Sequence, residues 1–393
     1  MQKFVKYILA VFIVISLSAC GGSSTTTAAT VVYDLVPVLA PANTHMGGSI
    51  QGGTITAKFT NYSVSTLPVF ANTSTTTKAT FNHPTDITYN WKNNSFYVAD
   101  YGNNLIRQIL PSGIVSTLQC TTDGTIPAHF NGPSSITTDG DNLYVVDSVT
   151  NTIRFIEIAT NKVTIIGSTA GLSGSIDVSV LPPATTADIT LARFKQPTGI
   201  TTDGVSLYVT DSGNQTVRRI DIASRAVSTL AGTSGAIGST NDTAAAARFY
   251  TPGRITNDGV NLYLTDFNNR NVRMIDILTG AVTTIAGSSG QVGTDDGTLD
   301  GIGIDARFNQ PNGIATDGAY IYVTDSYHNT VRRIDKSPEH NVTTISGIAK
   351  TGGVGGAVDS PGSASFYTPI GITTNGTSLY IADTFNNAIR KMQ

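Results

Sequence analysis

One pattern of residues occurs six times in this chain of 393 residues, and it restricts the fold more than any other feature of the sequence. The motif Phe-x-x-Pro-x-x-Ile begins at Phe81, Phe130, Phe194, Phe249, Phe308 and Phe366. Further along each copy, an Asp precedes an Arg by seven positions, in the pairs Asp100 and Arg107, Asp147 and Arg154, Asp211 and Arg218, Asp266 and Arg273, Asp325 and Arg332, and Asp383 and Arg390. Repeats of this kind indicate an architecture built from six copies of one supersecondary unit.

Each copy contains four short runs rich in Val, Ile, Thr and Tyr, separated by turns of Gly, Asp and Asn, which indicates four antiparallel strands. Six such units without helical periodicity predict an all-β fold, a six-bladed β-propeller. The sixth copy ends after its third strand, whereas "YSVSTLPVF" at residues 62–70 repeats the fourth-strand pattern "AVSTLAG" of residues 226–232. We therefore predict that Val64 to Leu67 pair with the strand containing Ile389, so that an N-terminal strand closes the last blade.

The text "PTGITTDGVSLYVTDSGNQTVRRIDIASRAVSTLAG" at residues 197–232 resembles the NHL repeat, and all six copies between residues 81 and 393 match it at several positions. The resemblance implies a propeller fold. It implies little about function, because NHL propellers bind proteins, RNA or glycans and only some relatives are enzymes.

The N-terminus indicates export. Lys3 and Lys6 precede an apolar run at residues 7–17 and the sequence "LSAC", which is typical of a signal peptide over residues 1–19. Cys20 resembles the modified cysteine of bacterial lipoproteins, where cleavage before the Cys is followed by acylation of its sulfur and amino group. A plain secretory signal is the alternative. We predict a flexible tether over residues 20–60, a propeller over residues 61–393, and a lipid-anchored location in the cell envelope, at the outer membrane if the organism is Gram-negative.

Composition narrows the partners. Charged residues make up 13% of the chain, its net charge is −3, and no basic run occurs, so nucleic acid is not an expected partner. Once Cys20 is acylated, Cys120 is the remaining thiol, and no intrachain disulfide can form. Because Cys120 stands where other copies have Gly, we expect it to be a small packed residue.

The repeated Asp and Arg are interpreted as structural, since every blade needs the same turn and the same contact with its neighbour. We expect the Asp to accept backbone N–H groups of the turn that follows it, and the Asn residues there to adopt left-handed backbone geometry. Structural ion-pair networks mimic functional sites in this way.

Candidate site residues are therefore those that depart from the repeat. The second-to-third-strand turns and the long, unequal connections between blades lie on one side of the predicted disc, the loop-rich face; the other side, the far face, has nearly uniform turns. On the loop-rich face we predict five ligand-binding residues. They are Asp86 and Arg254 at the entrance to the innermost strand, on opposite sides of the ring, and Tyr327, His328 and Phe385 in the turns. The alternative is that Asp86 and Arg254 neutralise each other while the aromatic residues pack against adjacent loops.

The sequence indicates no catalytic group, metal or cofactor. A gluconolactonase-like propeller would need Glu in the channel, but Glu157 and Glu339 lie elsewhere; an amidating-lyase-like zinc site would need three His with ligand spacing. The Asp-rich segment at residues 293–305 leaves calcium binding open. We predict a binding or scaffolding propeller with a protein or glycan ligand. The alternatives are a hydrolase or lyase acting at the central channel and a purely structural envelope component.

Overall fold

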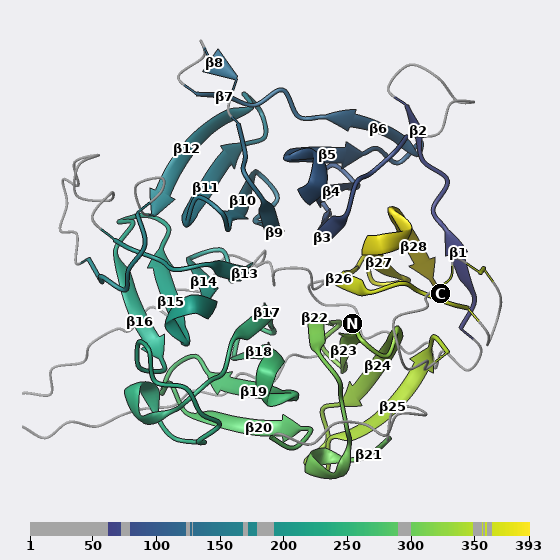
Figure 1. The fold of residues 1–393 in the computed structure, drawn as a ribbon. Coiled ribbons are helices and arrows are strands. Elements are labelled where there is room, and N and C mark those ends of the chain that lie inside the picture. The colour runs from purple at the N-terminus through teal and green to yellow at the C-terminus, as the bar shows by residue number, and fades with distance from the viewer. Residues whose placement is uncertain are drawn as a thin grey trace, which may run out of the picture. The chain divides into compact units, whose positions relative to one another are not determined.

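Six sheets surround a central axis in the computed structural model of the chain (Figure 1). It describes residues 62–71, 79–122, 126–127, 129–167, 172–178, 192–289, 300–348, 356, 358–359 and 364–393, all within the compact unit Ala42–Gln393. The predicted signal peptide, Cys20 and tether lie outside the described residues. Each innermost strand contacts the innermost strands of both neighbouring blades, so the ring is closed. The predicted all-β, six-bladed propeller is confirmed.

Each blade consists of four antiparallel strands, which follow chain order from the axis outward in blades 1 to 5, whereas in blade 6 the N-terminal strand is the outermost. Blade 1 consists of β3 (Pro84–Asn90), β4 (Ser95–Asp100), β5 (Leu105–Ile109) and β6 (Ile114–Thr117), and blade 2 of β9 (Pro133–Thr138), β10 (Asn142–Asp147), β11 (Thr152–Glu157) and β12 (Lys162–Gly167). Blade 3 consists of β13 (Pro197–Thr202), β14 (Ser206–Asp211), β15 (Thr216–Asp221) and β16 (Val227–Ala231), and blade 4 of β17 (Pro252–Asn257), β18 (Asn261–Asp266), β19 (Asn271–Asp276) and β20 (Val282–Ala286). Blade 5 consists of β22 (Pro311–Thr316), β23 (Tyr320–Asp325), β24 (Thr330–Asp335) and β25 (Asn341–Ser346), and blade 6 of β26 (Pro369–Thr374), β27 (Leu379–Asp383), β28 (Ala388–Met392) and β1 (Val64–Thr66).

The hydrophobic core lies between blades, which explains why the strands are apolar on both faces. One cluster joins Tyr144 and Val146 of blade 2 to Ile200 and Leu207 of blade 3, and similar clusters occupy the other junctions. Since each sheet is covered on both sides, the second strands have consecutive apolar residues, for example Leu207, Tyr208 and Val209 in β14.

Blade 6 is completed by the N-terminal segment, as predicted. Val64, Ser65 and Thr66 of β1 pair with Met392, Lys391 and Arg390 of β28, and the Leu67 N–H donates to the Ile389 carbonyl at 2.8 Å. Val64 is buried and belongs to the cluster of side chains between blades 5 and 6. The two ends of the propeller are therefore held together by one antiparallel strand pair.

The connections between blades do more than form surface loops on one face. Short strands in them, β2 (Phe70–Ala71), β7 (Thr121–Thr122), β8 (Ile126–Pro127) and β21 (Gly301–Ile302), add to the outer edges of blades 1, 2 and 5. Isolated bridges, Val178 to Val227 and Thr243 to Ala281, do the same for blades 3 and 4. These segments cover outer strands that would otherwise offer free edges for pairing with other chains.

Candidate functional site

The repeated Asp and Arg form an internal brace in each blade. In blade 3 the Asp211 Oδ2 accepts from Arg218 Nη1 at 3.0 Å, and both side chains are inaccessible to solvent. The Arg218 guanidinium also lies over the Phe194 ring, 5.0 Å from its centroid. Because the same arrangement recurs in the other five blades, with a longer Asp–Arg distance only in blade 5, the structural interpretation of the repeat is correct.

One detail of that interpretation was wrong. Asp211 does not accept the backbone N–H groups of the following turn, although the side-chain amide of Asn214 in that turn donates to its Oδ2. Its Oδ1 accepts the backbone N–H of Lys195 at 2.7 Å, from the segment that leads into the innermost strand. The Asp of each other blade accepts from the corresponding residue. The carboxylate thus joins the second strand to the entrance of the first, which lies beside it in the sheet but far away in the sequence.

Burial of these braces perturbs their titration. Burial raises the pKa of Asp211 and of Asp266 to about 6, although the partners Arg218 and Arg273 act in the opposite direction. Perturbed carboxyl groups often mark functional sites, but for Asp211 and Asp266 the cause is desolvation inside blades 3 and 4.

A second repeated contact joins neighbouring blades. The residue four positions after each Asp has left-handed backbone geometry, as expected for Asn104, Asn151, Asn329 and Asn387. Its side-chain oxygen accepts the N–H of the residue before Pro in the next blade; Asn387, for example, accepts from His83 at 2.7 Å. Blade 4 has Arg270 at this position, and its side chain is partly exposed. The Asn residues are therefore part of the scaffold.

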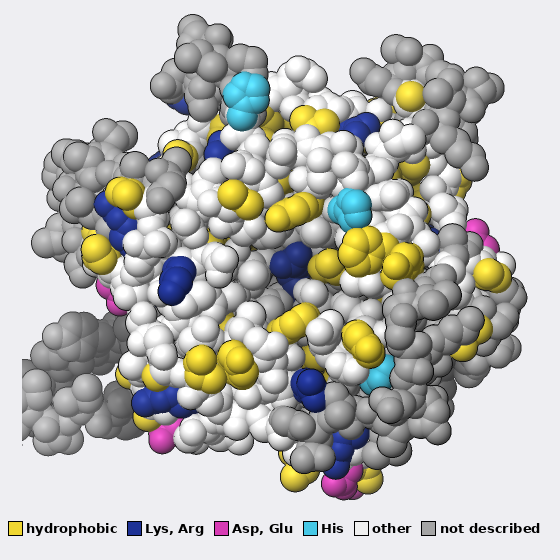
Figure 2. Space-filling view, in the orientation of Figure 1, with side chains coloured by type: hydrophobic (Ala, Val, Ile, Leu, Met, Phe, Trp, Pro, Cys, Tyr) yellow, Lys and Arg dark blue, Asp and Glu magenta, His cyan; other side chains and the backbone are white. Residues whose placement is uncertain are grey.

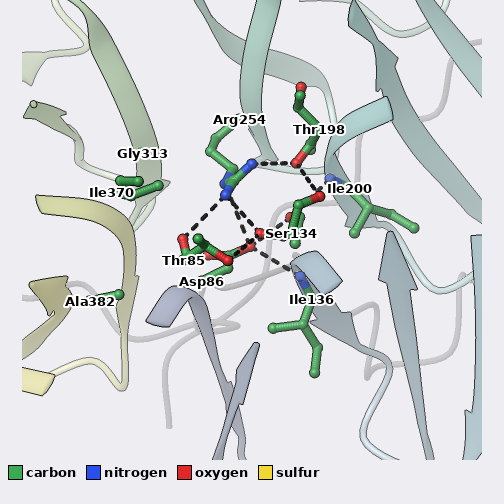
Figure 3. A network of polar contacts seen from close by, with 12 residues as sticks. Thr85, Asp86, Ser134, Ile136, Thr198, Ile200, Arg254, Gly313, Ile370 and Ala382 are labelled. Carbon is green, nitrogen blue, oxygen red and sulfur yellow. Dashed lines mark hydrogen bonds and ion pairs between the residues drawn. The ribbon is translucent and has the colours of Figure 1, made fainter. Parts of the chain in front are cut away.

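Asp86 and Arg254, the charged departures from the repeat, meet at the centre of the ring (Figure 3). Arg254 Nε lies 3.9 Å from Asp86 Oδ2. The Arg254 guanidinium donates to the Ser134 carbonyl at 2.7 Å, to the Thr85 carbonyl at 3.2 Å and to the Thr198 carbonyl. A single side chain of blade 4 thereby contacts the innermost strands of blades 1, 2 and 3.

The Asp86 carboxylate is held by its own neighbours as well. Its Oδ2 accepts from the Ser135 hydroxyl at 2.6 Å and from the Ile136 N–H at 3.0 Å. Asp86 and Arg254 are each 7% exposed. Burial raises the pKa of Asp86 and lowers the pKa of Arg254, while the attraction between the two charges opposes both shifts.

The other blades leave room for this pair at the axis. A Cβ on Gly371, the residue of blade 6 that corresponds to Asp86, would lie 2.5 Å from the Asp86 Cα. Small residues on neighbouring strands thus allow two long charged side chains to share one narrow opening.

The channel under the ion pair is almost filled. It is lined by one isoleucine from each blade, namely Ile87, Ile136, Ile200, Ile255, Ile314 and Ile372, and its cavity has a volume of about 20 Å³. That volume suffices for a water molecule, whereas sites for organic ligands measure several hundred Å³. A substrate therefore does not fit inside the channel as it stands in this structure.

His328 takes the place of a structural Asn. Its Nδ1 lies 3.0 Å from Asp325 Oδ2, where blades 1, 3, 4 and 6 have an Asn amide, such as Asn214 Nδ2 on Asp211. Arg332 Nη1 consequently stands 3.6 Å from Asp325, further than its counterparts in the other blades. The side chain is 1% exposed, so His328 supports the turn from inside and does not reach the surface.

Tyr327 and Phe385 lie in the corresponding turns and are exposed, by 40% and 47%. The Phe385 ring packs edge-on against His83 at 5.2 Å and beside Tyr367 at 5.1 Å between centroids. Tyr101 and Tyr250, which our sequence analysis missed, are exposed to a similar degree on the same face. We call Tyr101, Tyr250, Tyr327 and Phe385 the aromatic collar.

The collar is the surface feature that distinguishes this face. Among the described residues, every exposed Phe or Tyr side chain lies on this face and is a member of the collar. In Figure 2, which views the ring along its axis, hydrophobic side chains surround a central hollow with a Lys or Arg side chain at its centre. The signal for Tyr101 and Tyr250 was present in the sequence, because other copies have mainly Ser, Thr, Asn or Lys at those two positions.

The remaining candidates have other roles. Cys120 is buried beside Phe130, and burial raises its pKa to about 12, in agreement with a packed residue. Asp300 of the Asp-rich segment pairs with Arg332 at 2.8 Å and accepts the Thr344 N–H, while Asp295 and Asp296 lie outside the described residues. Among the described residues, no three His, Cys, Asp or Glu side chains are grouped so that they could hold a metal ion.

The fold and site define a six-bladed propeller with a nearly closed channel and an aromatic surface at one end. Residues 81–109 match the model of the NHL repeat, so the resemblance is confirmed for the first copy. Among the described residues, no helix is long and apolar enough to span a membrane.

Known proteins show similar chains. Protein SUPPRESSOR OF QUENCHING 1, chloroplastic, from Arabidopsis thaliana is 27% identical over 294 residues, which are 68% of this chain and 26% of that protein. NHL repeat-containing protein 2 from Homo sapiens is 32% identical over 142 residues, 33% of this chain and 18% of that protein. The chain thus spans about a quarter or less of the length of these relatives.

Among solved structures, an auxiliary nutrient binding protein from Bacteroides thetaiotaomicron superposes with a TM-score of 0.61 at 17% identity. The match covers 84% of this chain and 76% of that one. At this identity the likeness establishes the fold.

Proposed function

We propose that this protein is a lipid-anchored binding or scaffolding propeller of the cell envelope, and that its ligand binds to the loop-rich face. The observation that carries the proposal is that, in the part of the chain that the structure describes, the exposed Phe and Tyr side chains all lie on the loop-rich face. Aromatic residues contribute much of the binding energy in many interfaces. Their exposure to water as a group is unfavourable, and such groups often mark a surface that binds a partner.

Each predicted residue has a place in this proposal. Tyr327 and Phe385 contact the ligand together with Tyr101 and Tyr250, and Asp86 with Arg254 forms the floor between them. His328 is left out of the contact set because it is buried on Asp325. A binding role also agrees with the name of the Bacteroides thetaiotaomicron auxiliary nutrient binding protein, whose fold is similar.

The channel enzyme is the weaker candidate. A hydrolase or lyase working at the axis would need space for its substrate, but the cavity under Arg254 is about 20 Å³. The polar groups at its entrance, Asp86 and Arg254, already bind each other and neighbouring backbone groups. The geometry therefore favours binding over catalysis.

The anchor belongs to the same proposal and rests on the sequence "LSAC". An acylated Cys20 followed by a tether would attach the propeller to a membrane surface, with two or more chains giving stable attachment. Mass spectrometry of the mature N-terminus tests it: a lipid-modified Cys20 supports the anchor, and an unmodified N-terminus at another residue contradicts it.

The binding face is tested by cosedimentation of the mature protein with an envelope fraction of its own cells. Part of this cosedimentation comes from the lipid anchor, and the rest from binding by the loop-rich face. The double variant Tyr327→Ala, Phe385→Ala should lose the part that does not depend on the lipid. The matched control is Val260→Ala with Leu278→Ala, two exposed apolar residues in turns of the far face. Equal binding by both double variants, or equal loss, would contradict the proposal.

A further inference from the structure

The chemistry of the loop-rich face identifies a class of ligand. Its central part consists of the six turns after the second strands and the two residues between Phe and Pro in each copy. We call these the mouth segments; they are residues 82–83, 101–104, 131–132, 148–151, 195–196, 212–215, 250–251, 267–270, 309–310, 326–329, 367–368 and 384–387. All of them belong to the part of the chain that the structure describes.

The apolar surface of the mouth segments is aromatic. Of their exposed large apolar residues, all but Val149 are members of the collar. Exposed Leu and Ile, in contrast, lie in the connections between blades or on the far face, for example Ile237, Ile304 and Leu278. Val149, which lies beside Tyr101, is the one exposed aliphatic residue of the mouth segments. Exposed flat rings of this kind suit a partner that stacks on them and is held from above.

The charge of the mouth segments is positive. They contain no Asp or Glu, and Lys195 is exposed and Arg270 partly exposed. Neither side chain has a hydrogen-bond or ion-pair partner among the described residues, unlike Arg254 and the six repeated arginines. Lys195 belongs to blade 3 and Arg270 to blade 4, so the two cations lie on adjacent blades.

The far face has the opposite character. Acidic residues outnumber basic ones in its turns, where Lys92, Arg225 and Lys336 are the basic residues and two of them pair with Asp141 and Asp258. The acidic residues are Asp139, Asp141, Glu157, Asp203, Asp221, Asp258, Asp276, Asp317, Asp335 and Glu339. On the loop-rich face, in contrast, Figure 2 shows no Asp or Glu side chain around the central hollow, and the few that are visible lie at the rim of the disc. Such a charge distribution directs a negatively charged ligand to the loop-rich face and away from the far face.

Uncharged hydrogen-bonding groups complete this surface. Asn131, Gln196 and Gln310 are exposed mouth-segment amides that can both donate and accept hydrogen bonds. A sugar ring has the matching groups: polarised C–H bonds on one face, which stack on the negative face of an aromatic ring, and hydroxyls around its edge, which bind amides.

We propose that the ligand of the loop-rich face is an acidic oligosaccharide, in which sugar rings stack on the aromatic collar and uronate carboxylates pair with Lys195 and Arg270. This inference rests on the proposed function and adds the chemistry of the ligand. An acidic peptide fits less well, because the outer strands of blades 1 to 5 already carry short strands or bridges at their edges, and the cavity at the axis, with a volume of about 20 Å³, is too small for a side-chain anchor.

The collar is held in place before the ligand arrives. Its rings stand on turns that are fixed by the Asp–Arg braces and by the Asn contacts between blades. A rigid surface of this kind loses little conformational entropy on binding, which allows useful affinity without a deep pocket.

The experiment is titration calorimetry on the full mature protein in detergent micelles. The probes are hexamers of galacturonate, glucuronate and mannuronate, the methyl esters of the same hexamers, and a hexaglutamate peptide. The methyl esters keep the sugar rings and lack the negative charges, whereas the peptide keeps the negative charges and lacks the sugar rings.

We expect at least one uronate hexamer to bind, with its methyl ester about tenfold weaker and no binding of hexaglutamate. Phe385→Ala should weaken the uronate about tenfold, and Lys195→Gln with Arg270→Gln should reduce it to the level of the ester. Leu278→Ala on the far face is the control and should bind normally.

Three results would overturn the proposal: no binding of any uronate, equal binding of acid and ester, or equal binding of hexaglutamate. If no uronate binds while cosedimentation still requires Tyr327 and Phe385, the ligand class is wrong and the proposed binding face stands. If cosedimentation is also independent of these residues, the proposed function itself fails.

Discussion

Asp325 and Tyr327 stand two positions apart in one turn, yet they belong to different parts of the molecule. The Asp325 side chain is inaccessible and accepts hydrogen bonds from the Asn309 N–H and from His328, whereas Tyr327 is 40% exposed and projects from the loop-rich face. The first residue occurs in every blade, and the second varies from blade to blade. The contrast teaches that, in this repeat protein, constancy among copies marks the brace and variation marks the surface where a ligand can bind.

The largest expected effect comes from removing a whole element of the scaffold. Deletion of residues 20–70 removes β1 and exposes the edge of β28, while deletion of residues 20–61 leaves β1 in place. We expect the longer deletion to lower the free energy of unfolding by about 5 kcal/mol, most of the stability of a typical domain, and the shorter one to leave it unchanged. Denaturant unfolding measures both; equal midpoints would refute the closure of the ring by β1.

A single brace should come next. Arg218→Ala leaves Asp211 buried without its counter-charge and removes the cation over Phe194, so we expect a loss of about 3–5 kcal/mol. Lys195→Ala, an exposed cation in the same blade, should cost less than about 0.5 kcal/mol. If both variants unfold at the same denaturant concentration, the repeated Arg does not brace the blade.

Arg254 lies between the two categories, because it departs from the repeat but is buried. Arg254→Ala removes donors from three backbone carbonyls and the counter-charge of Asp86, which keeps Ser135 and Ile136 as partners. We expect a loss of about 2–3 kcal/mol in unfolding free energy, smaller than that of Arg218→Ala. A loss below about 0.5 kcal/mol would mean that the ion pair does not hold the blades together.

The smallest expected effect is on the dependence of stability on pH. The pKa of Asp211 and of Asp266 is about 6 in the folded protein, above the ordinary value of 3.8, so these carboxyls bind protons more tightly in the folded state. Their contribution is present in full below the ordinary value and is lost as the pH rises through about 6. We therefore expect the free energy of unfolding to increase modestly when the pH is lowered from about 7 to about 5.

The matched variant for this measurement is Asp211→Asn. It should reduce the change in the free energy of unfolding between about pH 7 and about pH 5. Carboxyls whose pKa is lowered, such as Asp258 and Asp359, lose their contribution only at more acidic pH, outside the window. A steady fall in stability from about pH 7 to about pH 5 would contradict the assignment.

Comparison of the six copies predicted the fold and the closure of the ring, because the sequence of β1 resembles the sequence of the fourth strand in other blades. It could not predict the true acceptor contact of Asp211, since Lys195 comes close only when the innermost and second strands pair. The sequence also did not reveal that His328 is buried on Asp325. An imidazole Nδ1 can replace an Asn amide as the partner of the Asp, so a different residue type performs the same structural task.

The binding role of the candidate residues stays a prediction, but the structure shows where they lie. The sequence placed Asp86 and Arg254 on opposite sides of the ring, and the structure brings their side chains together at the axis. Their burial follows from the narrow axis, which the sequence does not reveal. Partners of the repeated Arg in the connections, such as Asp177 and Asp359, were missed because those segments differ in length and cannot be aligned.

The central claim is that the braces carry stability and the collar carries binding, and one comparison tests it directly. Unfolding free energy and envelope cosedimentation are measured for Tyr327→Ala with Phe385→Ala and for Arg218→Ala. The account predicts that the collar variant loses binding while its stability changes by less than about 1 kcal/mol, and that Arg218→Ala loses about 3–5 kcal/mol but still binds under conditions where it is folded. A collar variant that binds normally, or one as unstable as Arg218→Ala, would contradict the account.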